Sequence, residues 1–249
     1  MKSRRTQAAA ALLVAASSAL LTGPGAARGA DVPPPPRGYT RLSDERLVTR
    51  WANAVARAPV RRNPDGQSNG IARLHFDTED HFREVYLVLA RYDDGRGNQW
   101  LRIRLPMRPN GRVGWVRRRA LGRLHMADTY FEVDRHRLRA RLFRRGRVIW
   151  RASVGIGRPG AETPRGRFWV REKFRVRSSG TLYGPYAFGT AAYSRLSDWP
   201  RGGVVGVHGT NEPGLIPGRP SHGCIRVRNP KIRRLWRLMP IGTPVRIIG

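Results

Sequence analysis

Short segments in which apolar and polar residues alternate, separated by turn-forming clusters, dominate the chain after its first 58 residues. Ile71–Phe76, Trp100–Leu105 and Leu138–Phe143 alternate with the period of two that is typical of strands with one buried face. Asp93-Asp94-Gly95 and Arg108-Pro109-Asn110-Gly111 supply turn chemistry between such segments. The pattern predicts a mostly β protein built from short strands.

Few helices are expected beside these strands. Leu42–Val55 contains a candidate short helix, and a clear amphipathic pattern places Ile232, Leu235, Trp236 and Met239 on one face. Asn229 is a favourable N-cap for that second helix, followed by Pro230 at its first position. The fold class is therefore mostly β with one or two short helices.

The first 30 residues have the layout of a secretory signal. Lys2, Arg4 and Arg5 precede the apolar run Ala8–Leu21, and small residues follow at Gly25-Ala26-Ala27. Export to the cell wall or periplasmic space is expected, and the alternative is an uncleaved signal that anchors the protein at the membrane. Neither the Sec nor the twin-arginine route is favoured.

The remaining chain divides into three parts by composition and pattern. Residues 31–57 are expected to form a proline-rich linker and the short helix, residues 58–124 a small β-barrel, and residues 129–248 a second β-rich domain.

Charge narrows the classes of partner. The formal net charge is +31, from 48 Lys and Arg against 17 Asp and Glu. Such a surface attracts polyanions, among them nucleic acid, anionic lipid and anionic wall polymers. The signal and the absence of a recognisable nucleic-acid-binding motif argue against nucleic acid, so anionic wall polymers are the candidate partners that fit best.

One cysteine is present, Cys224. Exported proteins usually pair their cysteines, so a single one is either a buried apolar residue or a thiol kept for chemistry. The apolar segment Val204–Val207 ends at His208-Gly209, and after a Gly- and Pro-rich loop the chain returns to His222-Gly223-Cys224. This arrangement predicts that both histidines and the thiol meet at one strand–loop–strand unit.

These residue types suit nucleophilic catalysis. A histidine within hydrogen-bond reach can accept the thiol proton and lower its pKa from about 8.5. Gly223 permits a tight turn whose amides could face a developing oxyanion, and Arg226 could hold a substrate carboxylate. A zinc site made by the same residues lacks a good fourth ligand, so no metal is expected.

The motif resembles the L,D-transpeptidase catalytic domain, the YkuD family. The resemblance rests on His208-Gly209-Thr210, on Ser221-His222-Gly223-Cys224-Ile225-Arg226, and on Thr163-Pro164-Arg165-Gly166-Arg167-Phe168, which matches a second family motif. It extends over roughly residues 129–248. Residues 58–124 are similar to a bacterial SH3-like domain, on weaker signals around Ala58–Pro64, Trp100–Ile103 and Gly114–Val116.

The resemblance implies a role for each matched position. Cys224 would be the nucleophile, His208 the general base and acid, and His222 a supporting residue. The Gly209 carbonyl would orient the His208 ring, the Gly223 amide would serve the oxyanion site, and Ser221 and Arg226 would contact substrate.

The implied activity is 3→3 cross-linking of peptidoglycan stem peptides through a Cys224 thioester, without cofactor and with carbapenem-type β-lactams as inhibitors. The alternatives are an L,D-carboxypeptidase on the same fold and a non-catalytic wall-binding protein. A papain-like peptidase is disfavoured because its cysteine precedes its histidine. The acceptor, the diamino acid and the oligomeric state are left open.

Overall fold

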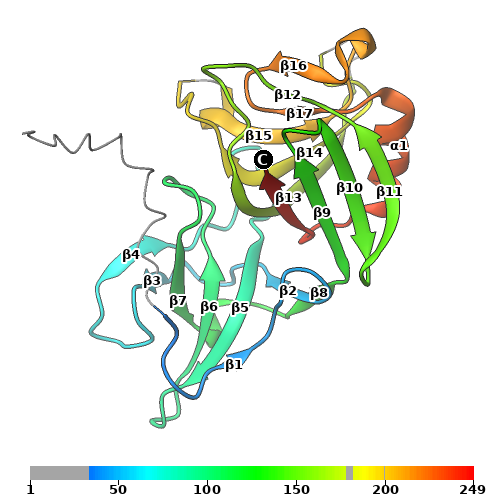
Figure 1. The fold of residues 1–249 in the computed structure, drawn as a ribbon. Coiled ribbons are helices and arrows are strands. Elements are labelled where there is room, and N and C mark those ends of the chain that lie inside the picture. The colour runs from blue at the N-terminus through cyan, green and yellow to red at the C-terminus, as the bar shows by residue number, and fades with distance from the viewer. Residues whose placement is uncertain (1–33, 178–181, 199) are drawn as a thin grey trace, which may run out of the picture.

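The computed structural model describes residues 34–177, 182–198 and 200–249 (Figure 1). The predicted signal, residues 1–30, lies outside them. Within the described residues, strands form two sheets and there is one α-helix, which confirms the expected mostly β fold. No helix in these ranges is long and apolar enough to cross a membrane.

The N-terminal sheet has eight strands in the order β4-β3-β7-β6-β5-β2-β8, with β1 paired to β5. Their bounds are β1 Thr40–Arg41, β2 Thr49–Ala52, β3 Pro59–Arg61, β4 Gly70–Arg73, β5 Tyr86–Asp93, β6 Gln99–Arg104, β7 Val113–Arg117 and β8 His125–Ala127. The 3₁₀ turn η1, Arg118–Ala120, follows β7. Alternate residues of these strands, such as Val88, Leu101 and Val116, fill a core of their own.

The short helix expected within Leu42–Val55 is wrong. Asp44 Oδ1 accepts the N–H groups of Arg46, Leu47 and Val48, as an N-cap would. Glu45, however, has a φ of 59°, which a right-handed helix cannot contain. The chain then enters β2, which pairs with β5 on one side and β8 on the other, so sheet hydrogen bonds take the place of helical ones.

The C-terminal sheet has ten strands in the order β11-β10-β9-β18-β13-β14-β15-β17-β12-β16. Their bounds are β9 Thr129–Asp134, β10 Arg139–Arg144, β11 Arg147–Ser153, β12 Gly155–Gly157, β13 Gly166–Arg175, β14 Tyr186–Tyr193, β15 Val204–His208, β16 Gly218–Ser221, β17 Ile225–Arg226 and β18 Pro244–Ile248. The 3₁₀ turns η2, Pro200–Gly203, and η3, Pro213–Leu215, lie in its connections. The last strand, β18, is inserted between β9 and β13 (Figure 1).

Helix α1, Asn229–Leu238, packs Ile232 and Leu235 into the core of this second sheet. The predicted apolar face is thus the buried face. Its N-cap position, however, is Arg228 and carries no side-chain cap, with Pro230 in the first turn. The Asn229 side chain accepts the N–H of Thr210 at 2.9 Å instead, so it ties the helix to the loop after β15.

A buried polar cluster joins the two sheets. Arg171 on β13 is 3% exposed and Glu84, just before β5, is 2% exposed. The guanidinium donates through Nε to Glu84 Oε1 at 2.8 Å and through Nη2 to Glu84 Oε2, and Nη2 lies 2.9 Å from Glu79 Oε2. Burial lowers the pKa of Arg171, but the bonds to Glu84 outweigh it and hold that pKa above its usual value. Two carboxylates of the N-terminal part therefore hold a cation of the C-terminal part.

Apolar contacts surround this cluster. Leu87 of β5 and Val85, the residue just before β5, pack with Trp169 and Ala191 of the second sheet. The Trp169 Nε1–H donates to the Val85 carbonyl at 2.7 Å, so the indole is both buried and hydrogen-bonded. The two sheets are therefore packed against each other through buried apolar side chains beside the Arg171 cluster.

We expect Arg171→Met to lower the free energy of unfolding by about 3–5 kcal/mol, because it leaves Glu84 buried without its cation. The double variant Arg171→Met/Glu84→Leu should lose less, since both charges are gone. Urea denaturation measures both. Arg91→Ala is the control, because its ion pair with Asp93 is about half exposed, and its loss should cost less than about 1 kcal/mol. Equal losses in the single and double variants would contradict the assignment.

Candidate active site

Parallel pairing of β15 with β17 builds the site. Val207 is opposite Ile225 and His208 is opposite Arg226. The pairing forms because Val205, Val207, Ile225 and Val227 are all buried in the core of the second sheet. In this register Cys224, the residue just before β17, lies beside Gly206, two residues before His208 on β15.

A hydrogen-bonded loop holds the cysteine. Gly223 has a φ of 124°, a conformation that favours glycine, in keeping with the tight turn expected there. The Ser221 hydroxyl donates to the Cys224 carbonyl at 2.6 Å, and the Thr163 hydroxyl donates to the Gly223 carbonyl at 2.7 Å. Thr163, fully buried, is the first residue of the second sequence motif. The structure therefore brings the two motifs into direct contact.

The Cys224 side chain is partly exposed. The Gly206 N–H donates to Cys224 Sγ at 3.4 Å, within the range of hydrogen bonds to sulfur. An N–H directed at sulfur favours the thiolate over the thiol. A Cβ on Gly206 would lie 3.8 Å from His208 Cδ2 and 3.9 Å from Cys224 Sγ. The His208 and Cys224 side chains therefore both lie next to Gly206, on the side where another residue would carry its side chain.

His208 is 4% exposed, and its Nδ1 lies 2.6 Å from the Gly209 carbonyl. A carbonyl only accepts, so Nδ1–H is the donor and Nε2 is the nitrogen that can take a proton. Burial lowers the pKa of His208 to about 4, Arg226 adds to that effect, and the Gly209 carbonyl opposes it. The ring is therefore neutral at pH 7, as a general base requires. The Tyr183 ring packs on it, with centroids 4.8 Å apart.

His222 is partly exposed at the outside of the loop. Its pKa is lowered by burial and by the nearby guanidinium groups of Arg158 and Arg226. Its supporting role remains a prediction.

Three residues expected to contact substrate or an oxyanion also have partners within the protein. Ser221 is 2% exposed and its hydroxyl is used inside the loop, so it holds Cys224 and has no surface to offer a substrate. The Gly223 N–H donates to Ser221 Oγ at 3.2 Å. Arg226 Nη1 lies 2.6 Å from Glu212 Oε2, so a carboxylate of the protein already occupies the proposed clamp.

Two contributors were missed at the sequence level. Gly206 was interpreted as one residue of a buried apolar strand, although a glycine in the middle of such a run is itself a sign of close approach. Asn229 was interpreted as a cap. Its Oδ1 would be 2.5 Å from a Cβ on Gly209, which shows how closely it packs on the histidine loop.

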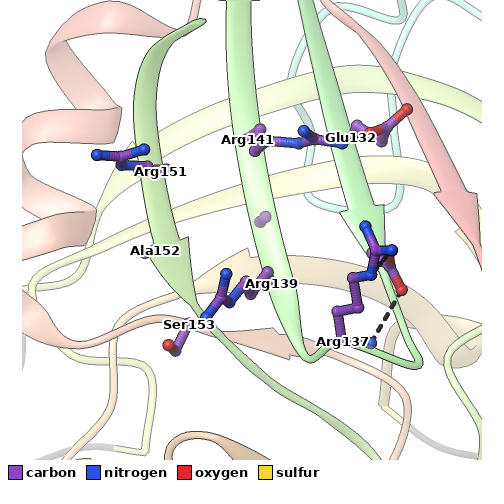
Figure 2. Close-up of a pocket in the computed structure, with 9 residues that line it drawn as sticks. Glu132, Arg137, Arg139, Arg141, Arg151, Ala152 and Ser153 are labelled. Carbon is purple, nitrogen blue, oxygen red and sulfur yellow. Dashed lines mark hydrogen bonds and ion pairs between the residues drawn. The ribbon is translucent and has the colours of Figure 1, made fainter.

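No group of three or more His, Cys, Asp or Glu residues that could hold a metal ion occurs in the described ranges. A hollow of about 460 Å³ lies elsewhere, on the outer face of β9, β10 and β11 (Figure 2). Four of its nine lining residues are arginines, including Arg139 and Arg151, and Arg141 lies alongside Glu132 there. None of the predicted catalytic residues lines it.

Residues 128–247 match the family model of the L,D-transpeptidase catalytic domain, YkuD. This segment is an L,D-transpeptidase catalytic domain. It agrees with the resemblance drawn from the His208, Cys224 and Thr163 motifs.

Curated relatives match the same region. The chain is 31% identical over 107 residues to a Bacillus licheniformis protein, YkuD, with 43% of this chain and 58% of that protein covered. It is 34% identical over 113 residues to a Salmonella typhimurium protein, ErfK/SrfK, with 38% of this chain and 36% of that protein covered. Both carry the L,D-transpeptidase designation in their names. The chain thus spans about half or less of the length of these relatives.

Solved structures are also similar. One is the NMR structure of the catalytic domain from E. faecium L,D-transpeptidase acylated by ertapenem, at 28% identity and a TM-score of 0.38. The similarity covers 50% of this chain and 99% of that one.

Gly206→Ala should slow acylation of Cys224 by about ten-fold or more. The added Cβ would lie 3.2 Å from the Phe188 carbonyl and in contact with both reacting side chains, so the strand or the thiol must shift. Mass spectrometry of the protein mixed with a β-lactam measures the rate. Gly214→Ala is the matched control, because a Cβ there would meet nothing within 4 Å. Equal rates for the two variants would contradict the geometry.

As the pH is lowered, the rate of Cys224 acylation should fall to half of its plateau value only well below pH 6.5. The pKa of His208 is lowered from 6.5 to about 4, so the base stays neutral and competent as pH falls through the ordinary histidine range, and is protonated only near the lower value. A pH profile of the same acylation reaction tests this. A midpoint at 6.5 or above would exclude His208, in the environment described, as the base.

Proposed function

We propose that the protein is an exported L,D-transpeptidase that forms 3→3 cross-links between peptidoglycan stem peptides through a thioester at Cys224. The observation that carries the proposal is the paired geometry at β15 and β17. A thiol that accepts the Gly206 N–H borders the same space as a neutral histidine whose other nitrogen is fixed by the Gly209 carbonyl.

In the first half-reaction, His208 Nε2 accepts the Cys224 proton and the sulfur attacks the carbonyl carbon of the third residue of a tetrapeptide stem. The C–S bond forms and the C–N bond to the terminal D-Ala breaks. The imidazolium returns its proton to the leaving amine, so D-Ala departs with a neutral amine. The low pKa of His208 makes its imidazolium a strong acid, which favours this return.

In the second half-reaction, the side-chain amine of another stem's diamino residue attacks the thioester. A C–N bond forms, the C–S bond breaks, and His208 accepts the amine proton and gives it to the departing sulfur. Attack by water would instead give a tripeptide. The same residues serve either outcome, so acceptor binding decides between transpeptidase and carboxypeptidase.

The rest of the proposal concerns location and the first sheet. The signal-like residues 1–30 support export to the cell wall or periplasmic space, and the net charge of +31 suits anionic wall polymers. We regard residues 58–124 as an SH3-like module. Support comes from their short, turn-linked strands and from a core separate from that of the catalytic domain.

The test is mass spectrometry of the products formed from purified disaccharide-tetrapeptide. We expect a cross-linked dimer with release of D-Ala, and no dimer from Cys224→Ala, because no other cysteine exists in the chain. The unfolding transition of Cys224→Ala should match that of the unmodified protein, since the thiol is partly exposed.

A tripeptide without dimer would replace the proposal by an L,D-carboxypeptidase. Product formation by Cys224→Ala would exclude the thioester mechanism altogether.

A further inference from the structure

The turn between β6 and β7, which belongs to the N-terminal sheet, contacts the catalytic domain at the end of β14. Asn110 Nδ2 donates to the Tyr193 carbonyl at 2.8 Å, and Asn110 Oδ1 accepts the Tyr193 N–H at 3.0 Å. The side-chain amide thus pairs with one backbone residue through both its donor and its acceptor. Such a two-point contact fixes the position and orientation of the Tyr193 backbone.

The Tyr193 side chain extends back into the N-terminal domain. Its hydroxyl donates to Glu79 Oε1 at 2.5 Å and lies 3.0 Å from the Pro106 carbonyl. The ring is 8% exposed and carries the Arg108 guanidinium over its face, 4.8 Å from the centroid. Tyr193 is therefore held by the N-terminal domain at its backbone, its ring and its hydroxyl.

Arg108 in the same turn closes the connection that leads from β14 to β15. Its Nη2 donates to the Ser194 carbonyl at 2.9 Å and to the Gly202 carbonyl at 2.7 Å. The Ser194 N–H donates to the Gly203 carbonyl at 2.8 Å, so the two ends of the connection already lie together. Arg108 adds a cationic donor to both ends, and bonds from a charged donor are about twice as strong as neutral ones.

This connection lies against the nucleophile loop. A Cβ built on Gly223 would be 3.1 Å from the Ser194 Cβ and 3.7 Å from a Val205 methyl. Ser194 is 4% exposed, so no solvent layer separates it from Gly223. Gly223 directly precedes Cys224 in the chain. A displacement of Ser194 is therefore transmitted through one contact to the residue that sets the position of the thiol.

We propose that Arg108 and Asn110 are positioning residues of the catalytic reaction, supplied by the N-terminal domain. They clamp Tyr193 and Ser194, and Ser194 holds Gly223 and hence Cys224 in the geometry for attack. The inference rests on the proposed function of Cys224 and adds that the first domain completes the active site. Neither residue touches a reacting atom, so their loss should reduce the rate of the chemical step and leave β-lactam binding nearly unchanged.

The experiment uses the full chain and a carbapenem, with covalent acylation followed by mass spectrometry over a range of drug concentrations. We expect Arg108→Ala and Asn110→Ala each to lower the rate constant at saturating drug by about ten-fold, since small misplacements of reacting groups cost that much or more. The concentration for half-maximal rate should change less than about two-fold. Arg108→Lys should recover part of the rate, because an ammonium can still donate to one of the two carbonyls.

Arg96→Ala is the matched control. Arg96 is an exposed arginine of the same sheet, in the β5–β6 turn, and its removal changes the charge equally without touching the catalytic domain. Its acylation constants should equal those of the unmodified protein. Urea denaturation of each variant verifies that the acylation assays are made on folded protein.

The outcomes separate the two proposals. If the unmodified protein is not acylated at Cys224, the proposed function fails. If it is acylated and folded Arg108→Ala and Asn110→Ala match it in rate constant, the positioning role is overturned while the function stands. A change confined to the half-maximal concentration would also overturn it, because it would place these residues in drug binding.

Discussion

The parallel contact between β15 and β17 is the constraint on which the site depends. Short strands on either side of a long Gly- and Pro-rich loop could pair in several registers, and a slip of one residue would turn His208 to the opposite face of the sheet. Burial of Val205, Val207, Ile225 and Val227 disfavours that slip, because a shift by one residue would turn the buried side chains of the shifted strand to the other face. The apolar residues thus place His208 and Cys224 relative to each other without taking part in the proposed chemistry themselves.

Burial also sets the protonation state of His208. His208 is enclosed by the sheet, the Tyr183 ring and the histidine loop, and Arg226 repels a proton from it, so its pKa falls to about 4. The Gly209 carbonyl fixes the tautomer, and the Gly206 N–H favours negative charge on sulfur. A buried histidine would by itself be a poor proton acceptor, and the bond to the sulfur partly compensates for this by making the thiol a better proton donor. For transfer of the proton from Cys224 to His208, the low pKa of the histidine is unfavourable and the Gly206 hydrogen bond to sulfur is favourable.

The contact between the two sheets brings the N-terminal domain next to the connection that packs on the Cys224 loop. Arg171 is buried with Glu84 and Glu79, and Trp169 packs on Val85, so the domains do not move independently without exposing charge and apolar surface. The Arg108–Asn110 turn is hydrogen-bonded to the backbone of Tyr193 and Ser194 at this contact. A domain that supplies rigid support to a nucleophile loop can be selected for that role whatever else it binds.

The sequence by itself was enough to predict the mostly β class and the buried face of α1, and it also proposed Cys224 and His208 as a reactive pair, because periodicity and short motifs are local properties. It failed where tertiary contacts compete with local preference. Asp44 looks like a helix cap, yet sheet partners on both sides of β2 outweigh that signal. The Asn229 side chain accepts the Thr210 N–H and does not cap the helix. The Ser221 hydroxyl donates to the Cys224 carbonyl, and Arg226 pairs with Glu212. Only the tertiary structure decided these points, and likewise the approach of Asn110 to Tyr193, since a hydrogen-bond partner distant in the chain leaves no mark on local sequence.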